Sequence, residues 1–448
     1  IEGLSFGINA NILSQSSGST IIWNGLDSAY IPLEKSITRT TGETYNIDPF
    51  ITYIKGNNRH SLRTRYLSVT NNNLTDGVDV GQNNSANNIT PGTPHRTGYQ
   101  KMTTQTIILP LLLLLTIETT ATVHQVSVFA KAGKYTTTYG TLDPTASAYG
   151  VFNASANATG WATLNIKANG EDLSNYFAAG LAEGVLTCNF VAAVAKNNRD
   201  IQSRKNPGLN NYTLLTISFT RRMAAAAAPS DDFWKVINEI LAQFDGLVEG
   251  YNRSPCSATQ PLDALDLWYM QMDGDLEDLN SKFSTSHVDV PDKSLAPPRP
   301  RPQHCSSLVK VTADRKDIFF GHATWDIYSN AAPRIFKTYT LPVKLGSVTK
   351  SHVTSFSSTG PWLSSVDDFY VVSGHANLGV METSNTVLNT SLYAKVQPKS
   401  LLCWLRVIAA NRLATSGKDW GQIFSKFHSG TYTNQWQVIS LDTFKPGA

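Results

Sequence analysis

The stretch His304-Cys305-Ser306-Ser307-Leu308-Val309-Lys310 decides how this chain is interpreted, because the character of the sequence changes there. Before it, residues 284–304 contain five prolines and few apolar side chains, a composition typical of an extended, exposed segment. After it, the chain is rich in strand-like runs. We interpret 284–304 as a processing segment; an interdomain linker and a proline-motif ligand are the alternatives. Cleavage after His304 would make Cys305 a new amino terminus.

An amino-terminal cysteine has a chemical advantage over a cysteine inside the chain. Its α-amine titrates near pH 7.7–8.0 and lies beside the thiol, so one residue supplies both nucleophile and general base. Most other reduced cysteines are inert core residues. The four cysteines, Cys188, Cys256, Cys305 and Cys403, contain no CxxC pair, so a zinc site or thioredoxin motif is unsupported. We expect at most one disulfide, because Cys305 must stay reduced.

The regions on either side of Cys305 predict an α+β fold. Downstream, apolar runs predict a strand pair, more strands, a helix and a late strand, at 306–311, 317–320, 335–343, 368–372, 378–382, 401–413 and 436–439. Upstream, the patterns predict strands at 126–130, 148–152 and 161–166, and helices at 174–187, 231–248 and 262–279.

Two upstream stretches depart from these patterns. Residues 195–228 have no clear period, and we interpret them as an insertion or a poorly predicted exon. Asp273-Gly274-Asp275 is similar to a calcium loop, but the later ligands are misplaced, so an ordinary acidic helix end is the better interpretation.

The strongest apolar run, residues 107–117, predicts a signal peptide. It is too short for a membrane span, which needs about 20 residues, and it has the length of a signal-peptide core. Met102 precedes it and small residues around Ala121 follow, so we assign 102–122 as the signal peptide; a buried helix or strand is the alternative. Residues 1–101 then form an unassigned upstream segment that the mature protein need not contain. We expect a secreted or lysosomal protein without a transmembrane span.

Composition and short motifs indicate which partners, cofactors and modifications to expect. A net charge of +3 without a basic stripe gives no reason to expect nucleic acid as a partner. Nothing indicates a metal or organic cofactor. If the chain enters the secretory route, four sequons predict glycosylation, at Asn153, Asn157, Asn211 and Asn389.

A series of collinear motifs carries a family resemblance. The Cys305 stretch is followed by His322-Ala323-Thr324-Trp325, and further segments occur in order on both sides: 148–153, 159–161, 178–184, 242–246, Phe356-Ser357-Ser358, Asp367-Asp368-Phe369-Tyr370, Met381-Glu382-Thr383-Ser384, 410–414 and 429–436. Over about residues 125–445, the chain resembles the phospholipase B-like family of N-terminal nucleophile hydrolases. The resemblance implies an αββα four-layer sandwich made by self-cleavage before Cys305. It divides the hydrolase domain into fragments 123–283 and 305–448.

The resemblance also implies an active site. Cys305 is the nucleophile that forms an acyl-enzyme, and His322 and Trp325 are pocket residues. Thr383 and Ser384 correspond to a family Thr-Thr pair in which a hydroxyl contacts the nucleophile. Without the motif, we would interpret His322 as a hydrogen-bonded strand-end histidine and Trp325 as a core aromatic residue.

The implied function is removal of fatty acyl groups from phospholipids, with transient contact to a membrane surface. An amidase on N-acyl lipids or peptides and a non-catalytic lumenal lipid-binding glycoprotein are the alternatives. Family members continue beyond Ala448, and the resemblance implies that oxyanion donors lie in that later part. Removing such donors typically costs several kcal/mol of transition-state stabilisation. We therefore expect this chain to be C-terminally truncated and incomplete in its sandwich.

Overall fold

The computed structural model describes residues 123–155, 160–197, 200–284, 305–325, 333–385 and 387–447. Upstream of these it gives only the backbone of five strands: β1 (Ile22–Trp23), β2 (Leu33–Glu34), β3 (Tyr45–Lys55), β4 (Asn58–Leu62) and β5 (Leu67–Val69). The predicted signal peptide at 102–122, the processing segment at 284–304 apart from Ser284, and Asn157 lie outside the described residues.

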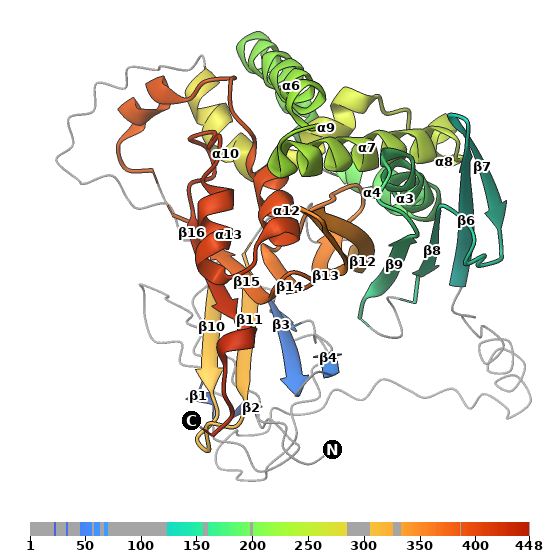
Figure 1. Cartoon of the computed structure of the whole chain (residues 1–448). Coiled ribbons are helices and arrows are strands. Elements are labelled where there is room, and N and C mark those ends of the chain that lie inside the picture. The colour runs from blue at the N-terminus through green and yellow to red at the C-terminus, as the bar shows by residue number, and fades with distance from the viewer. Residues whose placement is uncertain are drawn as a thin grey trace, which may run out of the picture. The chain divides into compact units, whose positions relative to one another are not determined.

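A nine-stranded mixed sheet forms the centre of the fold (Figure 1). Its spatial order is β16-β15-β14-β13-β12-β9-β8-β6-β7, in which β9 and β12 are parallel and the other neighbours antiparallel. The strands are β6 (Val123–Lys131), β7 (Lys134–Tyr139), β8 (Ala148–Asn153), β9 (Ala162–Ala168), β12 (Arg334–Leu345), β13 (Val348–Thr359), β14 (Phe369–Ser373), β15 (Asn377–Thr383) and β16 (Gln435–Ser440).

Burial along the central strands follows the two-residue alternation of a pleated sheet. In β9, Ala162, Leu164, Ile166 and Ala168 are buried while the residues between them are more exposed. The same alternation runs along most of β12. The pairing of β9 with β12 joins segments on either side of Cys305 into one sheet.

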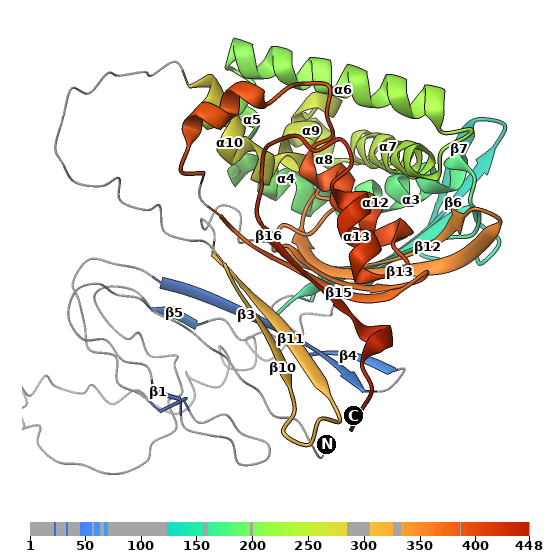
Figure 2. The same cartoon turned by 60° about the vertical axis from the view of Figure 1, so that its left-hand side comes forward.

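Helices cover one face of this sheet, and a second sheet lies against the other face (Figure 2). The helices are α3 (Leu173–Leu186), α4 (Cys188–Asn197), α5 (Asp200–Ser203), α6 (Pro207–Ala227), α7 (Asp232–Asn252), α8 (Cys256–Thr259), α9 (Ala264–Gln271), α10 (Asp273–Phe283), α12 (Cys403–Leu413) and α13 (Gly417–Phe424), with 3-10 turns η1 (Thr390–Lys395) and η2 (Leu441–Thr443). The second sheet follows the order β10-β11-β3-β4, where β10 is Ser306–Val311 and β11 is Ile318–Thr324. The α+β prediction is confirmed. The described residues provide one helical layer and two sheets, so they do not supply the second helical layer of the expected αββα sandwich.

A separate apolar cluster joins the two sheets. Phe320 of β11 packs with Phe369, Val371 and Met381 of the large sheet, and all four are buried. Phe320 and Phe369 stack with ring centroids 5.6 Å apart. This cluster anchors the β10–β11 hairpin, and therefore the segment that begins with Cys305, on the large sheet.

Helices α3 and α7 cross with their backbones in contact. A Cβ atom at Gly180 would lie 1.8 Å from the carbonyl oxygen of Gln243, and one at Gly246 would lie 1.9 Å from that of Phe177. Only glycine permits this approach. Two of the motifs, at 178–184 and 242–246, therefore form one helix–helix contact.

The structure differs from the sequence patterns at two upstream places. Residues 195–228, whose sequence has no clear period, contain α6, a helix that begins at the cap residue Asn206, whose side chain accepts from the backbone N–H groups of Gly208 and Leu209. The single helix predicted at 262–279 is divided at Met272 into α9 and α10.

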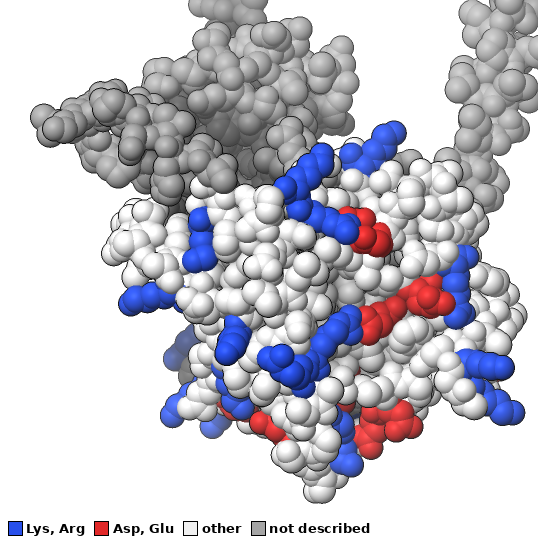
Figure 3. Space-filling view, turned by 90° about the horizontal axis from the view of Figure 1, so that it is seen from above, with Lys and Arg blue, Asp and Glu red and all other residues white. Residues whose placement is uncertain are grey.

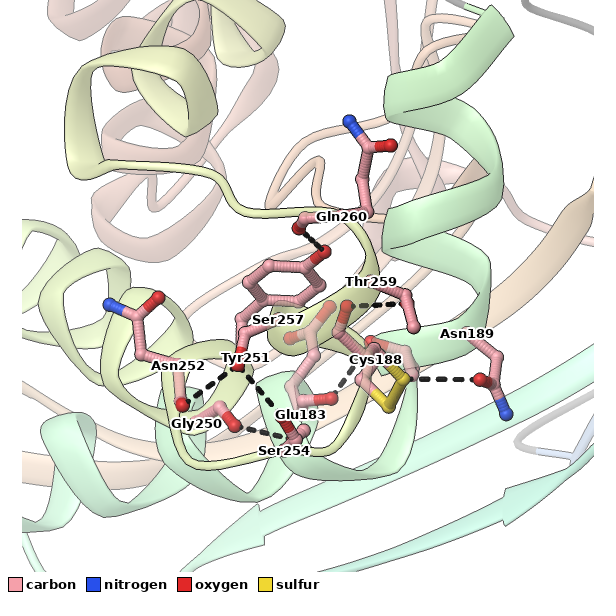
Figure 4. Close-up of a disulfide and its surroundings, with 12 residues drawn as sticks. Glu183, Cys188, Asn189, Gly250, Tyr251, Asn252, Ser254, Ser257, Thr259 and Gln260 are labelled. Carbon is pink, nitrogen blue, oxygen red and sulfur yellow. Dashed lines mark hydrogen bonds between the residues drawn. A yellow bond between two sulfur atoms is a disulfide. The ribbon is translucent and has the colours of Figure 1, made fainter.

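One disulfide joins Cys188 of α4 to Cys256 of α8 (Figure 4). Next to it, the Tyr251 hydroxyl donates to the carbonyl of Gln260 at 2.5 Å. The bridge closes a loop that contains α5, α6 and α7, and on a chain-entropy argument this stabilises the fold by about 4 kcal/mol. Cys305 and Cys403 lie outside the disulfide, so the expectation of at most one is confirmed.

In the part of the chain that the structure describes, no single helix has the length and apolar composition to cross a bilayer. Helices α3 and α4 pass that test only as a pair, and they meet at 71°.

Candidate active site

Cys305 immediately precedes β10, and its backbone is in the left-handed region with φ of +69°. The residue is half-buried. Left-handed backbone disfavours residues with a Cβ by roughly 1–2 kcal/mol, and such conformations cluster at functional sites. The strain at Cys305 therefore marks it as a candidate site residue independently of its sequence motif.

His322 lies on β11, directly opposite Ser307 of β10, and only 4% of it is exposed. Its Nε2 is 2.7 Å from the carbonyl oxygen of Glu382. A carbonyl oxygen can only accept, so Nε2 carries the proton, and Nδ1 is left to accept from the Thr324 hydroxyl at 3.3 Å. Burial lowers the pKa of His322 to about 4, so the imidazole is neutral at pH 7.

The other predicted site residues take different positions. Trp325 follows β11 and is 36% exposed, so the alternative of a core aromatic residue is wrong. Thr383 ends β15 opposite Gln435 of β16, and Ser384 follows it; both are half-buried. Through Glu382, the structure brings His322 next to the Thr383–Ser384 segment, whereas the Trp325 side chain lies partly at the surface.

A cluster of acids that we did not predict lies beside these residues. Asp368 precedes β14 and Glu382 lies on β15, and the backbone N–H of Glu382 donates to the carbonyl of Asp368 at 3.1 Å. The Tyr432 hydroxyl donates to the Asp368 carboxylate at 2.5 Å. Asp368 and Tyr432 also have left-handed backbone, with φ of +51° and +47°. All three residues lie in motifs that carry the family resemblance; acids within otherwise apolar strand sequence were the signal that could have identified the cluster.

The two carboxyls are too buried for both to be ionised. Exposure is 7% for Asp368 and 0% for Glu382. Burial raises the pKa of Asp368 to about 7. The pKa of Glu382 is raised above that of Asp368, first by burial and then by the charge of Asp368. The pair therefore holds one proton near neutral pH.

Tyr432 contacts this pair through its hydrogen bond to Asp368. Burial first, and then the charges of Asp368, Glu382 and Cys305, raise the pKa of the Tyr432 phenol. Its ring lies against Gly274 of α10, and its backbone N–H donates to Asp278 at 2.8 Å. Tyr432 is thus fixed in position between the acid pair and α10.

A small cavity of about 30 Å³ reaches Asp368 and Tyr432 from the helical side, where Asp275 and Cys403 also line it. The Asp275 carboxylate accepts from the backbone N–H of Cys403 at 2.9 Å and from the Thr431 hydroxyl at 2.5 Å. Asp275, which lies in the stretch similar to a calcium loop, thus accepts hydrogen bonds from the protein itself. Among the described residues, no group of three or more His, Cys, Asp or Glu side chains could hold a metal ion.

The surface carries charges of both signs. On the face seen in Figure 3, Lys and Arg side chains are dispersed and acidic side chains lie between them. Of the described sequons, Asn211 is exposed on α6 and Asn389 is exposed as the cap of η1. Asn153, at the end of β8, is half-buried, and its side-chain oxygen accepts from Ser155.

Comparison with known proteins gives one consistent result. The sequence model of the family described as Phospholipase B matches residues 148–448. The chain is 35% identical over 322 residues to Phospholipase B-like protein B of Dictyostelium discoideum, covering 69% of this chain and 55% of that protein. It is 35% identical over 352 residues to Phospholipase B-like 1 of Bos taurus, covering 75% and 62%, and 35% identical over 321 residues to the Homo sapiens protein of that name, covering 68% and 55%. The chain thus spans little more than half the length of these curated relatives.

Proposed function

The chain belongs to the phospholipase B family, and on that premise we propose that it is a hydrolase that removes fatty acyl groups from phospholipids, with Cys305 as its nucleophile. The names of its relatives support a lipid hydrolase. The single structural observation that favours Cys305 is its strained left-handed backbone at the head of β10, whose partner strand β11 packs on the large sheet through Phe320.

The proposed mechanism begins with self-cleavage. The Cys305 thiol attacks the carbonyl carbon of His304, the peptide C–N bond breaks, and the departing nitrogen takes up a proton to become the α-amine of Cys305. Water then hydrolyses the thioester and leaves a carboxylate on His304. The chain is cut, and the thiol and the new amine belong to one residue.

Lipid hydrolysis would use the same atoms. The α-amine takes the thiol proton as sulfur attacks the acyl carbonyl, and it returns a proton to the departing alkoxide. A water molecule, deprotonated by the amine, then releases the fatty acid. His322 is not the base in this scheme. Its Nε2 proton is donated to the Glu382 carbonyl, its Nδ1 accepts from Thr324, and burial lowers its pKa to about 4, which makes it a weak base. We assign it a positioning role, holding β11 and the hairpin against β15.

We also propose a secreted or lysosomal location. The disulfide between Cys188 and Cys256 favours an oxidising compartment, and the exposed sequons at Asn211 and Asn389 are compatible with glycosylation there. Transient contact with a membrane surface is part of the same proposal, because the substrate is a lipid.

Amino-terminal sequencing tests the proposal. The purified chain is incubated at acidic pH beside Cys305→Ala and the matched control Cys403→Ala, which removes a buried thiol on α12. We expect a new terminus at Cys305 in the parent and in Cys403→Ala, and none in Cys305→Ala. An intact chain in all three, found again in a chain extended to the length of its relatives, would overturn the nucleophile assignment and favour a lipid-binding glycoprotein. If cleavage occurs, matched ester and amide substrates with the same acyl chain distinguish a lipase from an amidase.

A further inference from the structure

The Glu382 carboxyl is buried without an adequate donor. The side chain is fully buried, and within the described ranges neither of its oxygens accepts a hydrogen bond of ordinary geometry. The group that faces it is the carboxyl of Asp368, and a hydrogen bond between two carboxyls requires a proton on one of them. The Asn434 amide is close enough to lower the pKa of Glu382, but this lowering is smaller than the rise that Asp368 causes.

The surroundings of the pair are mainly acidic. The titratable groups that face it come from α10, β11, β14, α12 and the segment before β16: Asp275, Glu277, His322, Tyr370, Cys403 and Tyr432. Arg406 is directed elsewhere, because its guanidinium donates to the carbonyls of Leu401 and Phe424. A low-dielectric site with this composition favours the form of the pair that carries fewer charges.

We propose that Asp368 and Glu382 share one proton near neutral pH and take up a second on acidification, and that their charge acts on Cys305 across the contact between β15 and the β10–β11 hairpin, so that the pair regulates the nucleophile with pH. The contact is direct: the Glu382 carbonyl accepts from His322 of β11, and His322 pairs with Ser307, two residues after Cys305. Tyr432 is a positioning residue in this arrangement, because its hydroxyl donates to Asp368. The cavity that reaches Asp368 and Tyr432 gives the pair access to protons from solvent. The inference rests on the proposed function in taking Cys305 as the nucleophile and, for the effect on the α-amine, in taking Cys305 as a new amino terminus.

The sign of the effect follows from the charge. Near neutral pH the pair carries one negative charge, which disfavours the Cys305 thiolate and favours a protonated α-amine. Acidification removes that charge. The amine then gives up its proton more readily and can act as a base at lower pH. The pair would therefore move the working range of the enzyme toward acid, as a lysosomal location requires.

The test measures alkylation of Cys305 by iodoacetamide between pH 5 and pH 8, with the adduct located by mass spectrometry. In Glu382→Gln the amide donates to Asp368 and keeps it ionised, so the charge is constant. In the double variant Asp368→Asn/Glu382→Gln there is no charge at any pH. For both variants, the logarithm of the rate should rise with pH at a slope of one. The alkylation rate of the parent should equal that of the double variant at low pH and that of Glu382→Gln at high pH. Between these limits its logarithm should rise with pH at a slope below one.

The expected separation between the two variants is about threefold. A charge that changes the thiolate fraction tenfold also changes thiolate nucleophilicity in the opposite direction, which leaves roughly a threefold net effect. Asp172→Asn, which alters an exposed carboxylate before α3, is the control and should match the parent. Circular dichroism checks that each variant folds, and either variant alone can be compared with the parent.

Identical profiles for the parent and both folded variants would overturn the inference, because the pair would then have no influence on the thiol. The readout does not require catalysis. If amino-terminal sequencing shows no cleavage while the profiles differ as expected, the proposed function fails and the coupling stands.

Discussion

Two buried polar clusters contact the large sheet, and they are built in opposite ways. On the helical side, Lys337 of β12 is fully buried, and its Nζ donates to Glu183 of α3 at 2.7 Å and to the carbonyls of Gly360 and Trp362 at 2.9 and 2.7 Å. The Tyr339 hydroxyl donates to the second Glu183 oxygen at 2.6 Å. At the end of β14 and β15, Asp368 and Glu382 face each other with Tyr432 as the main donor.

The difference lies in the balance of charges and donors. Burial lowers the pKa of Lys337, but the charge of Glu183 opposes that effect, and all three ammonium protons have acceptors. Such a pair is stable over a wide pH range and holds α3 against the sheet. The acid pair lacks a countercharge of this kind, so its protonation changes with pH. Full pairing indicates a structural role, and incomplete pairing indicates a site that can respond to its surroundings.

The largest expected effect comes from breaking the balanced cluster. Lys337→Met leaves the Glu183 carboxylate buried without its countercharge, which should lower the free energy of unfolding by about 3–5 kcal/mol. Urea unfolding at pH 7 measures this loss. A loss below about 1 kcal/mol would mean that Glu183 takes up a proton at little cost, and the contrast between the clusters would disappear.

The next effect is a change in the pH dependence of stability. The pKa values of Asp368 and Glu382 are raised on folding from about 4, so their contribution to stability is fully present below pH 4 and is lost as pH rises through 7 and beyond. Glu382→Gln removes one of these groups and gives Asp368 a donor. Between pH 5 and pH 8 the variant should lose about 4 kcal/mol less than the parent, because one retained proton corresponds to about 1.4 kcal/mol per pH unit. Urea unfolding curves at four pH values provide the comparison, and parallel pH dependences would contradict the assignment of a shared proton.

A matched pair of substitutions then compares the two tyrosines. Tyr339→Phe removes a buried hydrogen bond to an ionised carboxylate and should cost about 1.5–3 kcal/mol. Tyr432→Phe should cost only about 0.5–1.5 kcal/mol, because Tyr432 is half-buried and the adjoining cavity admits water. Thermal or urea unfolding at pH 7 ranks the two. The reverse order would indicate that the acid pair is the more structural cluster.

The smallest effect provides the control for the first. Lys344 lies on the same strand as Lys337, but its ion pair with Glu171 is 3.8 Å long and both side chains are more than a third exposed. Lys344→Met should change the free energy of unfolding by less than about 1 kcal/mol, and less still at high salt. A cost near that of Lys337→Met would show that burial is not what distinguishes the two lysines.

Sequence reasoning succeeded where apolar spacing reflects burial. Helix α7 was predicted because Asp231 caps it and its apolar stripe faces the core. The β10–β11 hairpin was predicted from two apolar runs and a polar turn. Helix α6 was missed because its buried face includes Thr213, Thr216 and Thr220, whose hydroxyls donate to carbonyls four residues earlier. A hydropathy pattern counts these residues as polar, although Asn206 and Pro207 were a readable helix start.

The candidate site was predictable only in part. Cys305, His322 and the Thr383–Ser384 segment were found from motifs, but no periodicity indicates that Glu382 faces Asp368, since that contact depends on the pairing of β14 with β15. Strand β13 was missed for a related reason: its buried residues include His352, Thr354 and Ser357. Polar groups that are satisfied by tertiary contacts cannot be recognised before those contacts are known.

If the proposed cleavage before Cys305 takes place, the position of the disulfide determines how the cut protein unfolds and refolds. Cys188 and Cys256 both precede Cys305, whereas β9 and β12, which pair at the centre of the sheet, come from opposite sides of it. Once the bond before Cys305 is cut, no disulfide among the described residues joins the two pieces. Unfolding would then release two chains, and refolding would become a second-order reaction that slows on dilution. Only the uncut precursor could fold as one chain. The stability of the cut protein would therefore depend on how slowly it unfolds.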